Sequence, residues 1–167
     1  ARSQPFPRLT PPLARTSFTT ADLATLTPEH TDWCRNWITE KNLVSGGLYH
    51  PVKLNQPTIS FPGLQGGNNW GGMAFDSASG LLFVNTSDLG QVTELVPSQG
   101  PLAYERGPVS GRFMQPETRM PCQRPPWGQL HAVDTNTGRI AWQSTLGVTD
   151  TLPAALQDTG RPNVGGP

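Results

Sequence analysis

From about residue 57 onward, apolar and polar residues alternate over short stretches, as is typical of β-strands. Two segments in this region, residues 74–84 (AFDSASGLLFV) and 132–142 (AVDTNTGRIAW), share the pattern Ala-x-Asp-x-x-Ser/Thr-Gly followed by an apolar run. Each segment predicts a β-hairpin, in which the carboxylate of Asp76 or Asp134 accepts hydrogen bonds from the turn and the glycine takes the left-handed conformation. A hairpin cannot bury its own face. The repeated hairpins therefore indicate a propeller or another repeated β architecture.

One stretch, residues 20–42, has a helical pattern instead. Thr27 and Pro28 are typical of an N-cap followed by a proline in the first helical turn. Trp33 and Trp37 are separated by one helical turn, so they share one face of the predicted helix. We therefore expect a short helix that docks on a larger body.

Composition limits the class of protein. Glycine and proline each occur 18 times among 167 residues, which favours short strands joined by many turns. Five tryptophans and six phenylalanines argue against a disordered chain. Twelve basic residues balance twelve acidic ones, so nothing in the charge indicates a nucleic-acid partner. No apolar run approaches the roughly 18 residues that a membrane-spanning helix needs.

The two cysteines, Cys34 and Cys122, are far apart and have no CxxC spacing, which argues against a zinc or thioredoxin-like motif. The residues alone leave two readings open. The cysteines are either two buried thiols or the two ends of one long-range disulfide, which requires an oxidising compartment.

A glycine-rich segment, residues 66–72 (GGNNWGG), precedes the first hairpin. Glycine allows a tight turn or a close approach of the backbone to a ligand. On composition alone, Asn68 and Asn69 are turn residues and Trp70 belongs to the core. The alternative is that the asparagine amides and the indole contact a bound ligand.

The remaining polar residues offer no catalytic or metal-binding motif. The histidines have no metal-ligand spacing. We expect His30 on the surface of the helix, and His131 at a strand start on either face. Asp88 and Glu94 follow a strand and are expected to be solvated.

The run LHAVDTNTGRIAWQSTLG resembles the tryptophan-docking motif of quinoprotein dehydrogenases, Ala-x-Asp-x-x-Thr-Gly-Lys-x-x-Trp, with Arg139 at the lysine position. The segments QPFPRLTPPLARTSFTTADLATLTPEH, FPGLQGGNNWGGMAFDSASGLLFVNTSDLGQV and MPCQRPPWGQLHAVD resemble the membrane glucose, quinate and shikimate branch of the dehydrogenases that depend on pyrroloquinoline quinone (PQQ). The resemblance thus extends through almost the whole chain.

The resemblance implies an all-β fold, a partial β-propeller with a short helical insert. It suggests about two blades of an eight-bladed quinoprotein propeller, from the C-terminal half of a longer protein. We expect a proline-rich arm with a helical insert or connector in residues 1–56. The propeller blades are expected in residues 57–167 and continue beyond them.

In the family, the segment that matches GGNNWGG reaches the propeller axis, where the quinone lies. The resemblance therefore implies that Asn69, Trp70 and Asn85 contact PQQ. It also implies a calcium ion, whose ligands are expected outside this chain, as are the catalytic base and the partner that stacks on the ring. No catalytic or metal-binding residue is expected here.

The resemblance implies a periplasmic enzyme, membrane-associated or not, that oxidises a sugar or cyclic polyol and passes electrons to ubiquinone or another acceptor. Its partners would be the remaining propeller blades, and the isolated chain is expected to be inactive. The oxidising compartment favours a disulfide between Cys34 and Cys122. The alternative function is a non-enzymatic propeller module that binds or supports another molecule.

Overall fold

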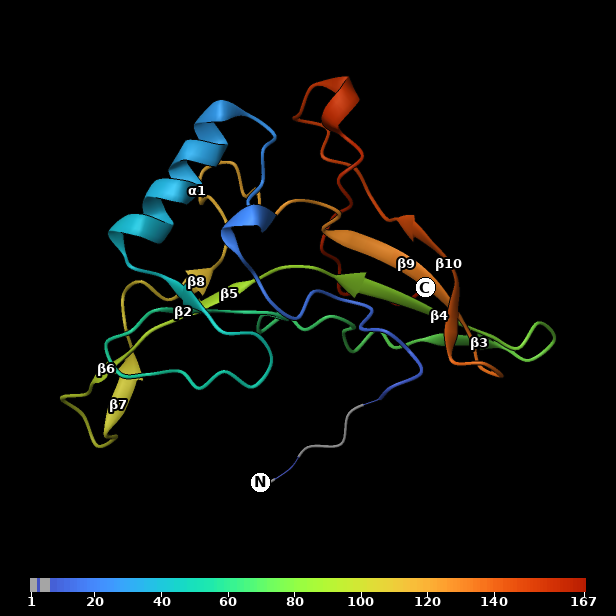
Figure 1. The fold of residues 1–167 in the computed structure, drawn as a ribbon, viewed down its shortest axis with the longest axis horizontal. Helices are drawn as coiled ribbons and strands as arrows, with labels where there is room; N and C mark the ends of the chain where they lie inside the picture. Colours follow the sequence, from blue (N-terminus) through green and yellow to red (C-terminus); the bar gives the residue numbers. More distant parts are fainter. Residues whose placement is uncertain (1–2, 4–6) are drawn as a thin grey trace.

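The computed structural model describes residue 3 and residues 7–167, so residues 1–2 and 4–6 of the predicted arm lie outside the described part. The described residues form mostly β-structure with one α-helix (Figure 1). The helical elements are the 3-10 turn η1 (Thr20–Asp22), the helix α1 (Pro28–Glu40) and the 3-10 turn η2 (Ala154–Leu156). The strands are β1 (Val44–Ser45), β2 (Thr58–Ser60), β3 (Ala74–Asp76), β4 (Leu81–Ser87), β5 (Gln91–Thr93), β6 (Leu95–Pro97), β7 (Tyr104–Arg106), β8 (Gly111–Arg112), β9 (Gly128–Asp134) and β10 (Arg139–Thr145).

The two hairpins predicted from the sequence are present, and they form one sheet. Its strand order is β10-β9-β4-β3, and every neighbouring pair is antiparallel. The long central pair aligns Leu81 with Asp134 and Ser87 with Gly128. This four-stranded up-and-down order is typical of a propeller blade. Within the described residues the sheets do not close on themselves, as expected of a partial propeller.

The hairpin turns have the predicted chemistry. Asp76 accepts a hydrogen bond from the backbone of Ala78 at 3.1 Å, and Asp134 accepts one from the backbone of Asn136 at 2.8 Å. The hydrogen bonds in these turns lower the pKa of both carboxyl groups, Asp76 mainly through Ser79 and Asp134 mainly through Asn136. The glycine that closes each turn is left-handed, with φ of 69° and 68°. Both aspartates are therefore turn residues.

A second sheet is built from segments on both sides of the first hairpin. Its order is β1-β2-β5-β8, with a parallel β1–β2 pair, and a separate hairpin joins β6 and β7. Strands β5 to β8 lie in the long connection between β4 and β9 (Figure 1). Residues on both sides of position 56 share one core. Its buried members are Phe18, Cys34, Leu43, Ile59, Phe61, Val92, Phe113 and Cys122.

The helix α1 begins where the sequence predicts. Thr27 is the N-cap and accepts a hydrogen bond from the backbone of His30 at 3.3 Å, and Pro28 occupies the first turn. Trp33 and Trp37 pack against the shared core, which confirms the predicted docking face. No helix in the described part of the chain combines the length and the apolar character that a membrane crossing requires.

The end of the chain returns to the blade-like sheet through Trp127. This side chain is 2% exposed, and its indole Nε1 donates to the carbonyl of Gln123 at 2.8 Å. The backbone N–H of Trp127 donates to the carbonyl of Thr159, and the carbonyl of Trp127 accepts from the backbone N–H of Asp88. These bonds place residues 159–166 beside β4, where the candidate site lies.

Candidate cofactor site

The glycine-rich segment 66–72 is a turn whose asparagines hold its shape. Asn68 donates through Nδ2 to the carbonyls of Gly72 and Asn85, at 3.2 and 3.1 Å. Asn69 donates to the carbonyl of Gln65 at 2.6 Å and accepts from the backbone of Trp70 at 2.7 Å. The turn is therefore tied directly to β4. Asn69 uses one amide N–H and one lone pair for this purpose and keeps one of each free.

Trp70 does not belong to the core. Its side chain is 91% exposed, although the backbone of the neighbouring turn is well bonded. A flat indole held in solvent by a tight turn is available to a ligand or to another part of a larger protein. The next residue, Gly71, lies so close to Gly166 that a Cβ at this position would meet its backbone nitrogen at 2.3 Å.

Asn85 lies on β4 and is buried. Its Nδ2 donates to the side-chain oxygen of Asn163 and to the carbonyl of Gly165. The hydroxyl of Ser87 donates to the carbonyl of Asn163 at 2.8 Å and accepts from its backbone nitrogen at 2.9 Å. The C-terminal segment therefore closes over Asn85.

Two buried polar atoms of this asparagine pair make no hydrogen bond within the described part of the chain. They are Oδ1 of Asn85, an acceptor, and Nδ2 of Asn163, a donor. Buried polar atoms are rarely left unpaired, because the lost hydration is costly. The pair therefore offers an acceptor and a donor to a polar ligand.

The structure brings together the turn that carries Asn69 and Trp70, the buried Asn85 and the segment 163–166. Asn163 was missed by the sequence analysis. The sequence feature that could have found it is the segment NVGG, residues 163–166, which places an asparagine close to two glycines as GGNNWGG does.

Asp88 is not solvated as expected but buried, with 8% of its surface exposed. Its Oδ2 accepts from Nε of Arg15 at 3.0 Å, and Arg15 also contacts Asp22 at 3.1 Å. Burial raises the pKa of Asp88, although the Arg15 guanidinium opposes this change. The sequence could not show this pair because 73 residues separate its two members.

His30 is also buried, contrary to the expected surface position. Its Nε2 lies 3.2 Å from the carbonyl of Met120, and burial lowers its pKa below the ordinary value of 6.5. A disulfide joins Cys34 to Cys122 beside this ring. The imidazole and the two sulfurs lie within 4.8 Å of one another. Because the sulfurs are bonded to each other, this cluster offers only the imidazole to a metal ion.

Acidification below about pH 6.5 is expected to lower the free energy of unfolding. The unfolded chain then takes up a proton at position 30 that the folded state resists, since burial lowers the folded-state pKa of His30. The stability that results from this pKa difference is fully present above pH 6.5. As the pH falls further, each buried histidine loses at most about 1.4 kcal/mol of this stability per pH unit. Burial lowers the pKa of His131 as well, so it acts in the same direction.

The measurement is urea unfolding at about pH 7.5 and about pH 5.5, for the natural protein and for His30→Gln. The variant should lose less stability between the two pH values. An equal loss in both proteins would show that His30 does not carry this dependence.

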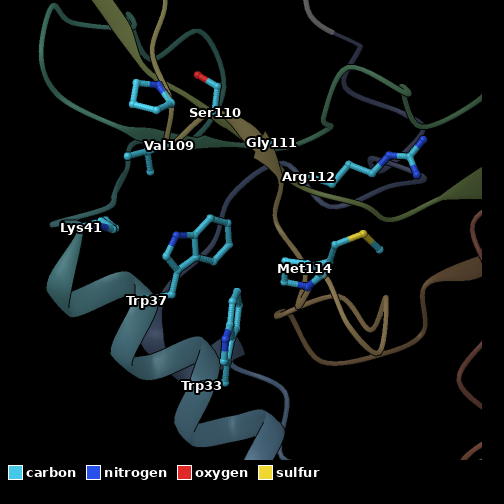
Figure 2. Close-up of a pocket in the computed structure, with 10 residues that line it drawn as sticks. Trp33, Trp37, Lys41, Val109, Ser110, Gly111, Arg112 and Met114 are labelled. Carbon is cyan, nitrogen blue, oxygen red and sulfur yellow. The ribbon is translucent and has the colours of Figure 1, made fainter.

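An apolar cavity of about 550 Å³ lies between α1 and residues 108–116 (Figure 2). Trp33 and Trp37 form one side of it, and Val109 and Met114 lie opposite. None of Asn69, Trp70 and Asn85 is among its described lining residues. This cavity is therefore separate from the candidate cofactor site.

Comparison with known proteins decides the family. The family model for the β-propeller domain of PQQ-dependent glucose, ethanol and alcohol dehydrogenases matches residues 1–167, the whole chain. The chain belongs to this family. The quinate/shikimate dehydrogenase (quinone) of Acinetobacter baylyi is 31% identical over 194 residues, which cover 100% of this chain and 24% of the relative.

Other relatives have different substrates in their names. The glycerol dehydrogenase large subunit of Gluconobacter thailandicus is 29% identical over 178 residues, covering 87% of this chain and 24% of the relative. The quinoprotein glucose dehydrogenase A of Acinetobacter calcoaceticus is 30% identical over 155 residues, covering 80% of this chain and 19% of the relative. The chain thus spans about a fifth to a quarter of the length of these relatives.

The described residues fit a planar quinone with carbonyl and carboxylate groups. The unpaired Nδ2 of Asn163 can donate to an oxygen, and the unpaired Oδ1 of Asn85 can accept from an N–H group. Trp70 presents an exposed ring on the glycine-rich turn, which is hydrogen-bonded to β4 through Asn68. The predicted contacts of Asn69, Trp70 and Asn85 with PQQ remain predictions.

Proposed function

We propose that this chain is part of the propeller of a PQQ-dependent dehydrogenase that oxidises a sugar or cyclic polyol and passes the electrons to ubiquinone or another acceptor. In this proposal the protein acts in the periplasm. The chain supplies one wall of the quinone site, and the remaining propeller blades complete it. The family match over all 167 residues supports this proposal, as do the unpaired Oδ1 of Asn85 and Nδ2 of Asn163 beside the glycine-rich turn.

In the proposed mechanism, Asn85 and Asn163 orient the cofactor through the acceptor and the donor that they leave unpaired. The glycine-rich turn lets the backbone come close to the cofactor and holds Trp70 at its edge, where the indole excludes water. When bound, PQQ supplies the two-electron acceptor for the oxidation, with a divalent ion such as calcium as a Lewis acid. The ligands of that ion and the base that removes the hydroxyl proton are expected on other parts of the longer protein.

Replacing Trp70 with alanine in the full-length protein is expected to weaken PQQ binding about 5- to 30-fold, because an aromatic contact of this kind contributes roughly 1–2 kcal/mol. The free energy of unfolding should change by less than about 0.5 kcal/mol, since the Trp70 side chain is 91% exposed. The measurement is titration of the cofactor-free protein with PQQ, followed by its absorbance.

Leu102→Ala is the matched control, because Leu102 is also exposed, at 71%, and lies in the distant β6–β7 connection. It should leave the dissociation constant of PQQ unchanged. Asn85→Asp keeps the size of the side chain but replaces the donor to Asn163 and Gly165, and should also weaken binding. If neither site variant weakens PQQ binding, the non-enzymatic propeller module becomes the better reading of this chain.

A further inference from the structure

The apolar cavity beside α1 lies outside the candidate cofactor site, and the proposed function does not use it. Its volume of about 550 Å³ is within the range of roughly 300–1,000 Å³ that is usual for small-molecule sites. It lies between α1 and residues 108–116, which surround β8 (Figure 2). None of its described lining residues is acidic. The cavity is therefore a candidate for a second ligand.

One side of the cavity is an aromatic wall on α1. Trp33, Trp37 and the C-cap Lys41 are spaced four positions apart, so they follow one face of the helix. The ring centroids of the two tryptophans are 5.2 Å apart. Trp37 also stacks on the fully buried ring of Phe113, at 5.7 Å between centroids. This core contact holds the wall in place, and its flat rings suit an apolar chain or ring.

Among the described residues, several hydrogen-bond donors at the cavity lack a partner. The indole N–H groups of Trp33 and Trp37 make no hydrogen bond to this part of the chain, whereas the indole of Trp127 does. Within the same residues, Lys41 forms no ion pair. Figure 2 shows the ring nitrogen of Trp37 on the side of Lys41. An indole N–H and an ammonium group on the same side of a cavity can both donate to one oxyanion.

Arg112 adds a second positive charge. It lines the cavity as well, and Figure 2 shows it on the opposite side of Trp37 from Lys41. It forms no ion pair with any described residue. The end of α1 opposes an anion only weakly, because the carbonyls of Trp37, Ile38 and Thr39 already accept backbone hydrogen bonds. The rim of this apolar cavity is therefore positively charged.

We infer that the cavity binds a small amphiphilic carboxylate, a molecule with an apolar chain or ring and one carboxylate group. The apolar part lies against Trp33, Trp37 and Met114, whose flexible thioether adapts to the shape of a ligand. The carboxylate accepts from Lys41 and from the indole of Trp37. The inference does not rest on the proposed function, because none of the residues assigned to the cofactor lines this cavity.

Gly111 offers a way to fill the cavity by substitution. This glycine lines the cavity, and a Cβ at its position would meet no other atom within 4 Å. Its backbone is not in the left-handed region, so another residue fits there without strain. Gly111→Leu therefore places a side chain in this open space. Gly111→Ala makes the same backbone change with a much smaller side chain and is its matched control.

The test is calorimetric titration of the full-length protein with decanoate. Gly111→Leu should weaken binding at least about tenfold, because the leucine takes the space of the apolar chain, and Gly111→Ala should weaken it much less. Lys41→Gln should weaken binding about two- to fivefold, the usual range for an exposed ion pair. Lys53→Gln removes an exposed lysine outside the cavity and should have no effect.

Two further probes separate the apolar part of the ligand from its charge. Decyltrimethylammonium has a chain of the same type with a positive charge, and acetate has the carboxylate without the chain. Each should bind at least about tenfold more weakly than decanoate. Equal binding of the two decyl probes would overturn the inference, because the site would then be apolar without selecting an anion.

Two other results would also overturn it. Undiminished binding of decanoate to a folded Gly111→Leu protein would place the probe elsewhere on the longer protein. Absence of decanoate binding would show that another part of that protein covers the cavity. Urea unfolding checks that Gly111→Leu is folded. If it is not, Lys41→Gln and the comparison of probes decide the question, since Lys41 is exposed and its substitution leaves the core intact.

Discussion

Reduction of the Cys34–Cys122 disulfide is expected to release α1 from the body of the protein. The bond joins the helix to the loop before Trp127 across 88 residues of sequence, and both cysteines are fully buried. Removal of such a cross-link typically costs about 2–5 kcal/mol. Amide hydrogens of residues 28–40 should therefore exchange at least about 30-fold faster after reduction.

The measurement is hydrogen exchange by mass spectrometry, with and without reductant, on peptides from α1 and from β9. The Cys34→Ser/Cys122→Ser variant should match the reduced protein and should not respond to reductant. The strands β4 and β9 pair with each other along their whole length, from Leu81 with Asp134 to Ser87 with Gly128, so their protection should fall much less. Equal protection of α1 in both redox states would show that packing alone holds the helix.

Replacement of Phe113 by alanine is expected to cost about 3–5 kcal/mol of unfolding free energy, the usual range for a fully buried phenylalanine. Its ring is 0% exposed and contacts Phe18 at 4.9 Å, Trp37 at 5.7 Å and Phe61 at 6.3 Å between ring centroids. The substitution thus removes a ring that contacts the arm, the helix and the residue that follows β2.

The check is a urea titration of the variant and of two comparisons. Phe113→Leu keeps much of the buried volume and should lose markedly less stability. Leu102→Ala removes an exposed side chain and should stay within about 0.5 kcal/mol of the natural protein. A loss below about 1 kcal/mol for Phe113→Ala would show that the three segments do not depend on a common core.

Local sequence signals predicted the local structure well. The capped helix after Thr27 and the aspartate-glycine hairpin turns at Asp76 and Asp134 are all present, because each depends on residues at most a few positions apart. The family resemblance was confirmed over the whole chain. It supplied the partial propeller, which two hairpins alone could not distinguish from other β architectures.

Contacts between distant segments were harder to predict. His30 was expected on the helix surface, but it contacts the carbonyl of Met120, which is 90 residues away. Asp88 was expected in solvent, but it pairs with Arg15 in the arm. Both errors have the same cause, since burial depends on which segment covers a residue, and no local pattern encodes that.

The sequence by itself determined where the helix begins and where the two hairpins turn, because capping and turn hydrogen bonds act within a few residues. It also indicated, by resemblance, that Asn69, Trp70 and Asn85 belong to one site. Only the tertiary structure decided that Asn163 faces Asn85 and that the arm, helix and second sheet share a core. Those features join segments that are distant in the sequence, such as Asn85 and Asn163, which are 78 positions apart, and such segments meet only when apolar burial and hydrogen-bond pairing are satisfied over the whole chain at once.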